Sequence, residues 1–164
     1  MKKLLTTGFV VLILGVWTFT IAQTVDKKAS KNMSLQASPS ATATFIPSSE
    51  VQASFEKGSP LVGHPGRNYA VITGKRDQAG SVELHEKDTD IFYIVDGAAT
   101  FVTRGKMVDR KVTEAGEVRG SAIEGGDTHQ LSRGDVVIIP AGVPHWFKEV
   151  QGPFHYFVVK VQNP

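Results

Sequence analysis

Two short stretches of the sequence combine metal-ligating side chains with residues that favour strands and turns. The first, VELHEKDTDIFYIVDG, places Glu83, His85 and Asp90 beside an apolar run. The second, GDVVIIPAGVPHWF, ends an apolar run in a proline–glycine turn that is followed by His145. Two imidazoles and one or two carboxylates that converge in space would suit a divalent transition metal such as iron, manganese, zinc, nickel or copper.

The pattern of the first stretch is compatible with two registers. In an extended strand alternate side chains face opposite sides, so Glu83 shares a face with His85. Val82 and Leu84 share the other face. Periodicity alone predicts that Val82 and Leu84 face inward. Glu83 and His85 would then be ordinary strand residues exposed to solvent. A shift of one residue reverses every side chain and would make them ligands. Alternation does not choose between these two outcomes.

The sequence around these stretches predicts an all-β domain. From about residue 62 onward, β-branched and aromatic runs alternate with glycine-rich turns. Many short strands at this spacing predict a β-sandwich or barrel, and no helical run is long enough for βαβ units. About a hundred residues is the size of one domain. We therefore expect one all-β domain over 62–164.

One short helix is predicted before the strands, within residues 45–61. Ser49 and Gln52 have the spacing of a capping box. Phe55 contributes to an apolar face, and Gly58 is a typical residue to end the helix. We expect this helix to cover one end or edge of the β-domain.

The N-terminal part of the sequence predicts export followed by a linker. Residues 1–22 begin with two lysines after the methionine and continue as an apolar run, closing on Thr-Ile-Ala before Gln23. This pattern is typical of a cleaved signal peptide and predicts a secreted or periplasmic protein with no membrane contact after cleavage. The alternative is an uncleaved membrane anchor, because the run is barely long enough to span a bilayer. Residues 23–44 are rich in Ser, Thr and Ala, which predicts a flexible linker.

Composition and charge exclude several classes of site and partner. The sequence has no cysteine, so disulfides and cysteine-ligated zinc or iron–sulfur sites are excluded. It contains 18 basic and 16 acidic residues, and loss of Lys2 and Lys3 with a signal peptide would leave 16 of each. A neutral mature chain predicts no nucleic-acid partner and no polybasic membrane patch.

In its second stretch the chain resembles the cupin superfamily. The second cupin motif reads G-x5-P-x-G-x2-H, and Gly134, Pro140, Gly142 and His145 stand at its positions. An asparagine is often found four residues after the motif histidine, and Glu149 stands there in this chain. Apart from that minor departure, strand, spacing and turn all agree with the motif.

The first stretch resembles the first cupin motif, with two departures. That motif ends H-x-H-x4-E-x6-G, and Glu83, His85, Asp90 and Gly97 occupy these positions. Glu83 therefore replaces a histidine, and Asp90 replaces a glutamate that is longer by one methylene group. The resemblance as a whole covers about residues 62–162.

The resemblance implies a fold and a ligand set. It implies a cupin double-stranded β-helix, or jelly-roll barrel, often dimeric, in which the two ligand positions of the first motif point inward. Germins and oxalate-degrading cupins use three histidines and one glutamate. Here the implied metal ligands are Glu83, His85, Asp90 and His145. Glu83 could instead lie beside the metal as a general base.

The implied inward register has a consequence for the outer surface. If the ligands of the first motif point inward, an apolar set points outward, comprising Val82, Leu84, Ile91, Tyr93 and Val95. Such a face needs a cover, either the N-terminal strands or a second subunit, and so it predicts a homodimer.

Four further residues are expected at the pocket. Phe92, Phe101 and Phe147 are aromatic strand residues that would be core in any β-domain, and in a barrel the core is also the pocket wall. His129 lies in a later strand and could contact metal-bound groups or a ligand.

Two hypotheses about function follow from the resemblance. The first is an exported small cupin that binds a divalent metal and a small oxygen-bearing ligand, as a metal-dependent dioxygenase, isomerase or lyase. The second is a non-catalytic module that binds a small molecule or a metal without turnover. The fold does not decide between them.

Overall fold

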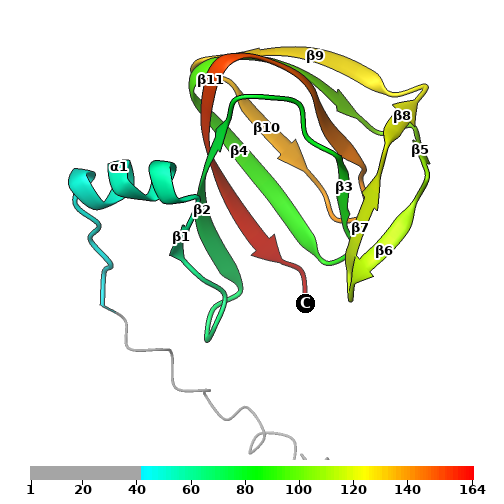
Figure 1. Cartoon of the computed structure of the whole chain (residues 1–164). Coiled ribbons are helices and arrows are strands. Elements are labelled where there is room, and N and C mark those ends of the chain that lie inside the picture. Colours follow the sequence, from blue (N-terminus) through cyan, green and yellow to red (C-terminus); the bar gives the residue numbers. More distant parts are fainter. Residues whose placement is uncertain (1–41) are drawn as a thin grey trace, which may run out of the picture. The chain divides into compact units, whose positions relative to one another are not determined.

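The computed structural model of the protein describes residues 42–164 (Figure 1). The signal peptide predicted over 1–22 lies outside these residues, and so does most of the linker predicted over 23–44. No helix in the described part is long and apolar enough to cross a membrane. The elements are α1 (Ser48–Lys57), β1 (Pro60–Val62), β2 (Tyr69–Arg76), β3 (Val82–His85), β4 (Asp88–Thr103), β5 (Lys106–Val108), β6 (Lys111–Glu114), β7 (Glu117–Gly120), β8 (Ala122–Glu124), β9 (Asp127–Ser132), β10 (Val136–Ile139) and β11 (His145–Gln162).

The long strands β4 and β11 organise the domain. They pair antiparallel along their whole length, with register shifts near the middle. In one half the strand order is β10-β4-β11-β2-β1. In the other half it is β9-β4-β11-β3-β7-β6. Figure 1 shows β11, coloured orange to red, curving from one half into the other. The predicted all-β architecture with one short helix is confirmed.

Inward-facing side chains from both halves form a single apolar core, so the sheet is folded over on itself as in a jelly roll. Alternate residues of each strand supply this core, because successive side chains face opposite sides. Its buried members are Phe92, Ile94, Ala99, Phe101, Leu131, Ile139, Phe147, Phe154, Tyr156 and Val158.

Gly97 lies where β4 bends between the two halves. Its φ is +83°, a left-handed conformation that residues with a Cβ rarely adopt. A Cβ at this position would also lie 2.5 Å from the carbonyl oxygen of Pro153 in β11. The glycine of the first motif is therefore required by both backbone conformation and the close approach of the two long strands.

The predicted helix forms, but its predicted N-terminal cap does not. Helix α1 begins after Pro47, whose extended backbone precedes the first turn, and no side chain caps the helix. The capping box of Ser49 and Gln52 is therefore wrong, because Ser49 already lies inside the helix. Its predicted end is confirmed, since Gly58 is the C-cap in the left-handed conformation.

Helix α1 packs on the outer face of the sheet. Thr73 of β2 donates a 2.8 Å hydrogen bond to the hydroxyl oxygen of Ser54, which is buried. The Phe55 ring meets the Phe157 ring of β11 edge-on, with centroids 5.4 Å apart. The helix thus covers part of the outer surface of β2 and β11 within the same chain.

The outer face predicted for Val82 is covered, but by neither of the two covers that the sequence suggested, the N-terminal strands or a second subunit. Val82 is fully buried, and so is Val118 on the neighbouring strand β7. The small sheet β5–β8 lies beside them, since a Cβ on Gly120 would be 3.1 Å from the Met107 side chain. The chain therefore covers this part of its own surface. Tyr93, on the other half of the sheet, is the predicted outward residue that remains exposed.

The turn that precedes His145 leads to a stability prediction. Gly142 has a φ of +80°, and a Cβ there would meet nothing within 4 Å. Gly142→Val should therefore destabilise the fold through backbone strain alone, by at least about 1 kcal/mol in urea unfolding. Gly142→Asn is the matched control and should cost less, because asparagine tolerates the left-handed region. Equal stability of wild type and the valine variant would contradict this account of the turn.

Candidate metal centre

The two motif stretches meet at one place in the folded chain. Strand β3 carries Glu83 and His85, and His145 begins β11 directly opposite Glu83 in the antiparallel register. The backbone N–H of Gly142 donates a 2.8 Å hydrogen bond to the carbonyl oxygen of His85, which ties the second turn to the first motif. The inward register of the first motif follows from this pairing.

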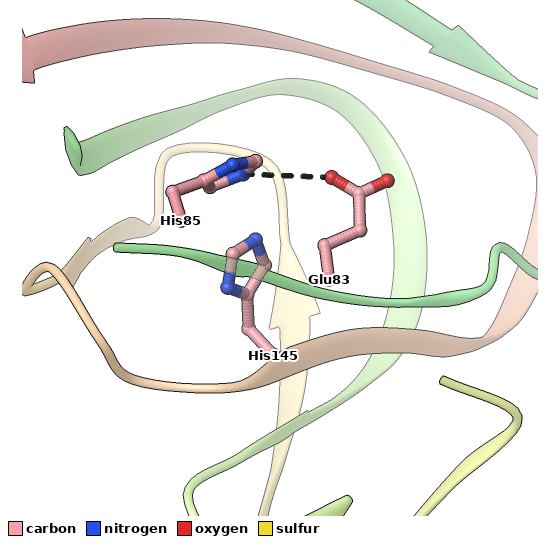
Figure 2. A group of neighbouring side chains, drawn as sticks. All are labelled: Glu83, His85 and His145. Atoms are coloured by element: carbon pink, nitrogen blue, oxygen red, sulfur yellow. Dashed lines mark ion pairs between the residues drawn. The ribbon is translucent and has the colours of Figure 1, made fainter. Parts of the chain in front are cut away.

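Three side chains at this place point toward one another. Figure 2 shows Glu83, His85 and His145 converging from two strands. One potential ligand atom of each lies within 4.8 Å of the others, which is a spacing that a single metal ion could bridge. Both histidines are buried, and Glu83 is half-buried.

Hydrogen bonds on the far side of each imidazole set its orientation. Nδ1 of His85 lies 2.8 Å from a carboxylate oxygen of Glu117. Nδ1 of His145 lies 3.2 Å from the carbonyl oxygen of Val143, which can only accept a hydrogen bond. These contacts place the Nδ1 protons on the outside and direct both Nε2 atoms inward. Metal-bound histidines are commonly held by such outer contacts.

The inward Nε2 atoms of His85 and His145 are buried, and neither has a hydrogen-bond partner in the described chain. Buried polar atoms almost always have a partner, and an unpaired one is costly. A cation bound between these two nitrogen atoms and the nearby carboxylate would give both nitrogens a partner. The donor set therefore fits a divalent transition metal.

The carboxylates give the site a strong negative field. Nε2 of His85 lies 3.6 Å from Glu83 and 3.4 Å from Asp90. Burial disfavours the charged imidazolium of His85, but the carboxylates of Asp90 and Glu83 outweigh burial and raise its pKa to about 10. Burial likewise opposes ionisation of Glu83, but His85 and nearby arginines hold its pKa down to about 2. The metal-free site thus attracts a proton at the point where a metal would bind.

Asp90 lies at the same place but has a second partner. Its Oδ2 is 3.4 Å from Nε2 of His85 and 3.8 Å from Nε2 of His145. Both of its oxygens accept hydrogen bonds from Lys160, at 2.8 and 3.0 Å. Burial opposes its ionisation, but His85 and Lys160 together lower the Asp90 pKa. The four predicted ligands are thus brought together, with Asp90 bound to a lysine as well.

A cavity of about 170 Å³ adjoins these ligands. Phe92 and Phe147, two of the predicted pocket residues, line it together with Glu83, Asp90 and His145. Its wall also includes residues that sequence reasoning did not select, namely Ile72, Arg76, Ser81, Tyr156, Val158 and Lys160.

The other two predicted pocket residues lie elsewhere. Phe101 is fully buried and packs behind the wall, with its ring centroid 4.6 Å from that of Phe147. His129 is exposed, and its Nε2 lies 3.3 Å from the hydroxyl of Thr103. It lines a separate groove beside β9 and β10. The alternation of side chains along a strand predicts which residues face inward. It does not distinguish an inward residue of the packed core from one that lines a cavity.

Lys160 and Arg76 escaped sequence reasoning because their roles depend on pairing between distant strands. Lys160 is opposite Asp90 in the β4–β11 register, although 70 residues separate them. Arg76 ends β2, opposite Phe154 of β11. The one signal in the sequence is that Lys160 lies an even number of residues after Phe154, Tyr156 and Val158. It therefore faces the same side of the strand as these apolar residues.

Several solved structures are similar to this chain at low sequence identity. A hydroquinone 1,2-dioxygenase from Sphingomonas with 4-hydroxybenzoate bound is 14% identical, with a TM-score of 0.44 over 59% of this chain and 61% of that chain. A DMSP lyase from Ruegeria pomeroyi is 21% identical, with a TM-score of 0.43 over 63% and 45%. A cupin protein from Bacteroides fragilis is 12% identical, with a TM-score of 0.42 over 74% and 83%. This chain thus spans less than two thirds of the dioxygenase and of the lyase.

Comparison of the sequence with curated proteins found no significant match. Comparison with family models found one, the model of the cupin family, over residues 75–164. The match covers more than half of the chain and includes both motif stretches and all four predicted ligands. The chain therefore belongs to the cupin family.

Proposed function

We propose that this cupin domain binds a divalent transition metal through Glu83, His85 and His145, and binds a small oxygen-bearing ligand in the cavity beside it. The observation that carries the proposal is the pair of buried, unpartnered Nε2 atoms directed at a point next to a carboxylate. Each histidine is already fixed from behind, so the site needs little rearrangement to accept an ion.

The donor set narrows the choice of metal. Two imidazoles and one carboxylate on one side of an ion are typical of iron(II) sites that keep open positions, and carboxylate oxygen also suits manganese. Zinc, nickel and copper remain compatible with imidazole ligands. When bound, such an ion supplies Lewis acidity or oxygen activation to a ligand in the cavity.

The chain's own residues position and shield the ligands. Glu117 and Val143 hold the imidazole rings, and Lys160 holds Asp90. Phe92 and Phe147 form an apolar part of the cavity wall. Asp90 is an inward carboxylate beyond the three converging ligands, and Lys160 donates to both of its oxygens. This spare carboxylate favours a metal-dependent dioxygenase, isomerase or lyase over the alternative of a non-catalytic binding module.

Metal loading tests the proposal directly. Protein stripped with chelator and incubated separately with iron(II), manganese, zinc, nickel and copper should retain about one ion per chain after desalting, because three protein ligands converge on one point. Elemental analysis measures the retained metal. A wild-type protein that retains none of the five at micromolar concentration would show that the histidines are structural.

Glu83→Gln separates the two roles of this residue. If Glu83 is a ligand, the amide should bind the metal at least about tenfold more weakly, because it lacks the charge. If Glu83 is a base beside the metal, the ion should be retained and turnover lost. Glu86→Gln is the matched control, since Glu86 is exposed and lies 3.6 Å from Arg110. A control variant that lost metal as strongly as Glu83→Gln would invalidate the comparison.

We also propose that the chain forms a homodimer through the outer face of β4 and β10. Tyr93, Val136 and Ile138 are 49%, 58% and 62% exposed, and Val136 is directly opposite Tyr93. Among described strands β10 pairs only with β4, so it forms an open edge beside this apolar surface. Analytical ultracentrifugation should show a dimer that Ile138→Asp dissociates, and a monomeric wild type would refute the proposal.

Export remains a proposal that rests on residues 1–22 alone. The lysines, apolar run and small-residue cleavage pattern favour a cleaved signal peptide and a secreted or periplasmic location. Mass spectrometry of protein expressed from its own start codon should find Gln23 as the first residue. A membrane-bound species that retains Met1 would favour the anchor instead.

A further inference from the structure

We propose that the cavity selects a small carboxylate and that Arg76 is the residue that binds the carboxylate group. The inference rests on the proposed function, because the ligand would lie between Arg76 and the metal site. It goes further by naming the chemical class of the ligand and the residue that determines specificity.

Arg76 is held in place on several sides. Its Nε donates a 3.2 Å hydrogen bond to the hydroxyl oxygen of Tyr156. Its guanidinium carbon lies 5.0 Å from the centroid of the Phe147 ring, a cation–π contact. A Cβ on Gly80 would lie 2.6 Å from Nη1, so the guanidinium packs closely against this glycine. A guanidinium fixed in this way loses little freedom when it binds a ligand.

The outer donors of Arg76 are available to a ligand. Among described residues, neither Nη atom makes a hydrogen bond, and the nearest carboxylate oxygen, from Glu83, is 3.6 Å from Nη2. The Nη atoms therefore offer N–H groups at a cavity wall. A planar guanidinium edge matches a carboxylate through two parallel hydrogen bonds, a geometry that lysine cannot reproduce.

The charges lining the cavity favour an anion once a metal is bound. Glu83 and Asp90 contribute two negative charges, and Arg76 and Lys160 contribute two positive charges. Lys160 donates hydrogen bonds to both oxygens of Asp90, whereas Arg76 forms only a longer ion pair with Glu83, at 3.6 Å. A divalent cation would leave the lining with a net charge of about +2, which attracts an anionic ligand.

The size and walls of the cavity limit the rest of the ligand. Ile72, Phe92 and Val158 provide an apolar surface next to the charged groups. The volume of about 170 Å³ is close to that of an engineered cavity, of about 150 Å³, that holds benzene. A ligand of roughly six non-hydrogen atoms with one carboxylate and a short apolar part fits these limits.

Butanoate and its neutral isostere butanamide test the proposal by calorimetry on the metal-loaded protein. Wild type should bind butanoate at least about tenfold more tightly than butanamide, because a charged hydrogen-bond pair is lost in the amide. Arg76→Gln should abolish this preference and retain the metal. Arg76→Lys should restore only part of it. Lys75→Gln removes the same charge from the adjacent position, where Lys75 pairs with Glu56 outside the cavity, and should leave the preference unchanged.

The outcomes separate this inference from the metal proposal. Equal binding of the two probes by metal-loaded wild type, or an unchanged preference in Arg76→Gln, would overturn the carboxylate inference and leave the metal site intact. If the wild type retains none of the five metals but still shows a preference for butanoate that depends on Arg76, the inference is supported and the metal proposal is overturned. Tighter binding of inorganic phosphate than of butanoate would overturn the assignment to carboxylates. If Arg76→Gln fails to fold, Tyr156→Phe, which removes the Nε contact, should weaken the preference, and an unchanged preference would contradict the inference.

Discussion

His85→Ala and His145→Ala are each expected to weaken metal binding by more than about 100-fold, since even outer contacts to metal ligands contribute 10–100-fold. Each Nε2 is one of three converging donors, and the remaining two donors cannot hold an ion in a closed geometry. The double variant should therefore bind metal little more weakly than either single variant, because the first substitution already destroys the site. Titration with a competing chelator measures the affinities.

The controls for this experiment come from the same chain. His129→Ala removes an exposed imidazole that lines a different groove, so metal binding should be unaffected. Circular dichroism should show that all variants remain folded, because the substitutions leave every residue of the apolar core unchanged. Additive losses in the double variant, or full metal binding by either single variant, would contradict a shared site.

Lys160→Met is expected to destabilise the metal-free protein by about 3 kcal/mol. The Asp90 side chain is only 3% exposed, and Lys160 donates to both of its oxygens. Removal of the lysine leaves a buried carboxylate with too little compensation, which is more costly than loss of the attraction alone. A bound metal would supply the missing positive charge, so much of the lost stability should return in the loaded variant. Urea unfolding of chelated and loaded protein measures both effects.

The comparison with Lys75→Met makes this prediction specific. Lys75 pairs with Glu56 at the surface, where water screens both charges, and its loss should change the free energy of unfolding little. If Lys160→Met costs no more than Lys75→Met, Asp90 does not depend on its lysine. If the loss is the same with and without metal, Asp90 does not interact with the bound ion.

Several features of the fold could be predicted because they depend on residues close together in the chain. The alternation of short apolar runs with glycine turns predicts an all-β domain, and the structure confirms it. The spacing of Gly134, Pro140, Gly142 and His145 identified the family, because each turn glycine and proline serves a local backbone conformation. Gly58 was correctly predicted as a helix end for the same reason. The capping box was wrong because its spacing alone does not show where the helix starts.

The burial of the first motif was decided by the tertiary structure. Alternation required either Val82 or His85 to face water, yet both are buried. The inner face of β3 directs Glu83 and His85 toward His145, and the small sheet β5–β8 lies beside Val82 on the outer face. Prediction from the alternation of one strand assumes that one of its faces is exposed to solvent. Here a second layer, formed by residues later in the chain, covers that face.

The residues that distinguish this site also came from the tertiary structure. The sequence by itself determined the family, the all-β class, and the four side chains predicted as ligands. Their convergence on one point depends on His145 pairing opposite Glu83, and the state of Asp90 depends on Lys160, 70 residues away. Arg76 and Lys160 line the cavity because β2 and β4 both pair with β11. Such contacts are set by the register between distant strands, which the local spacing of residues does not encode.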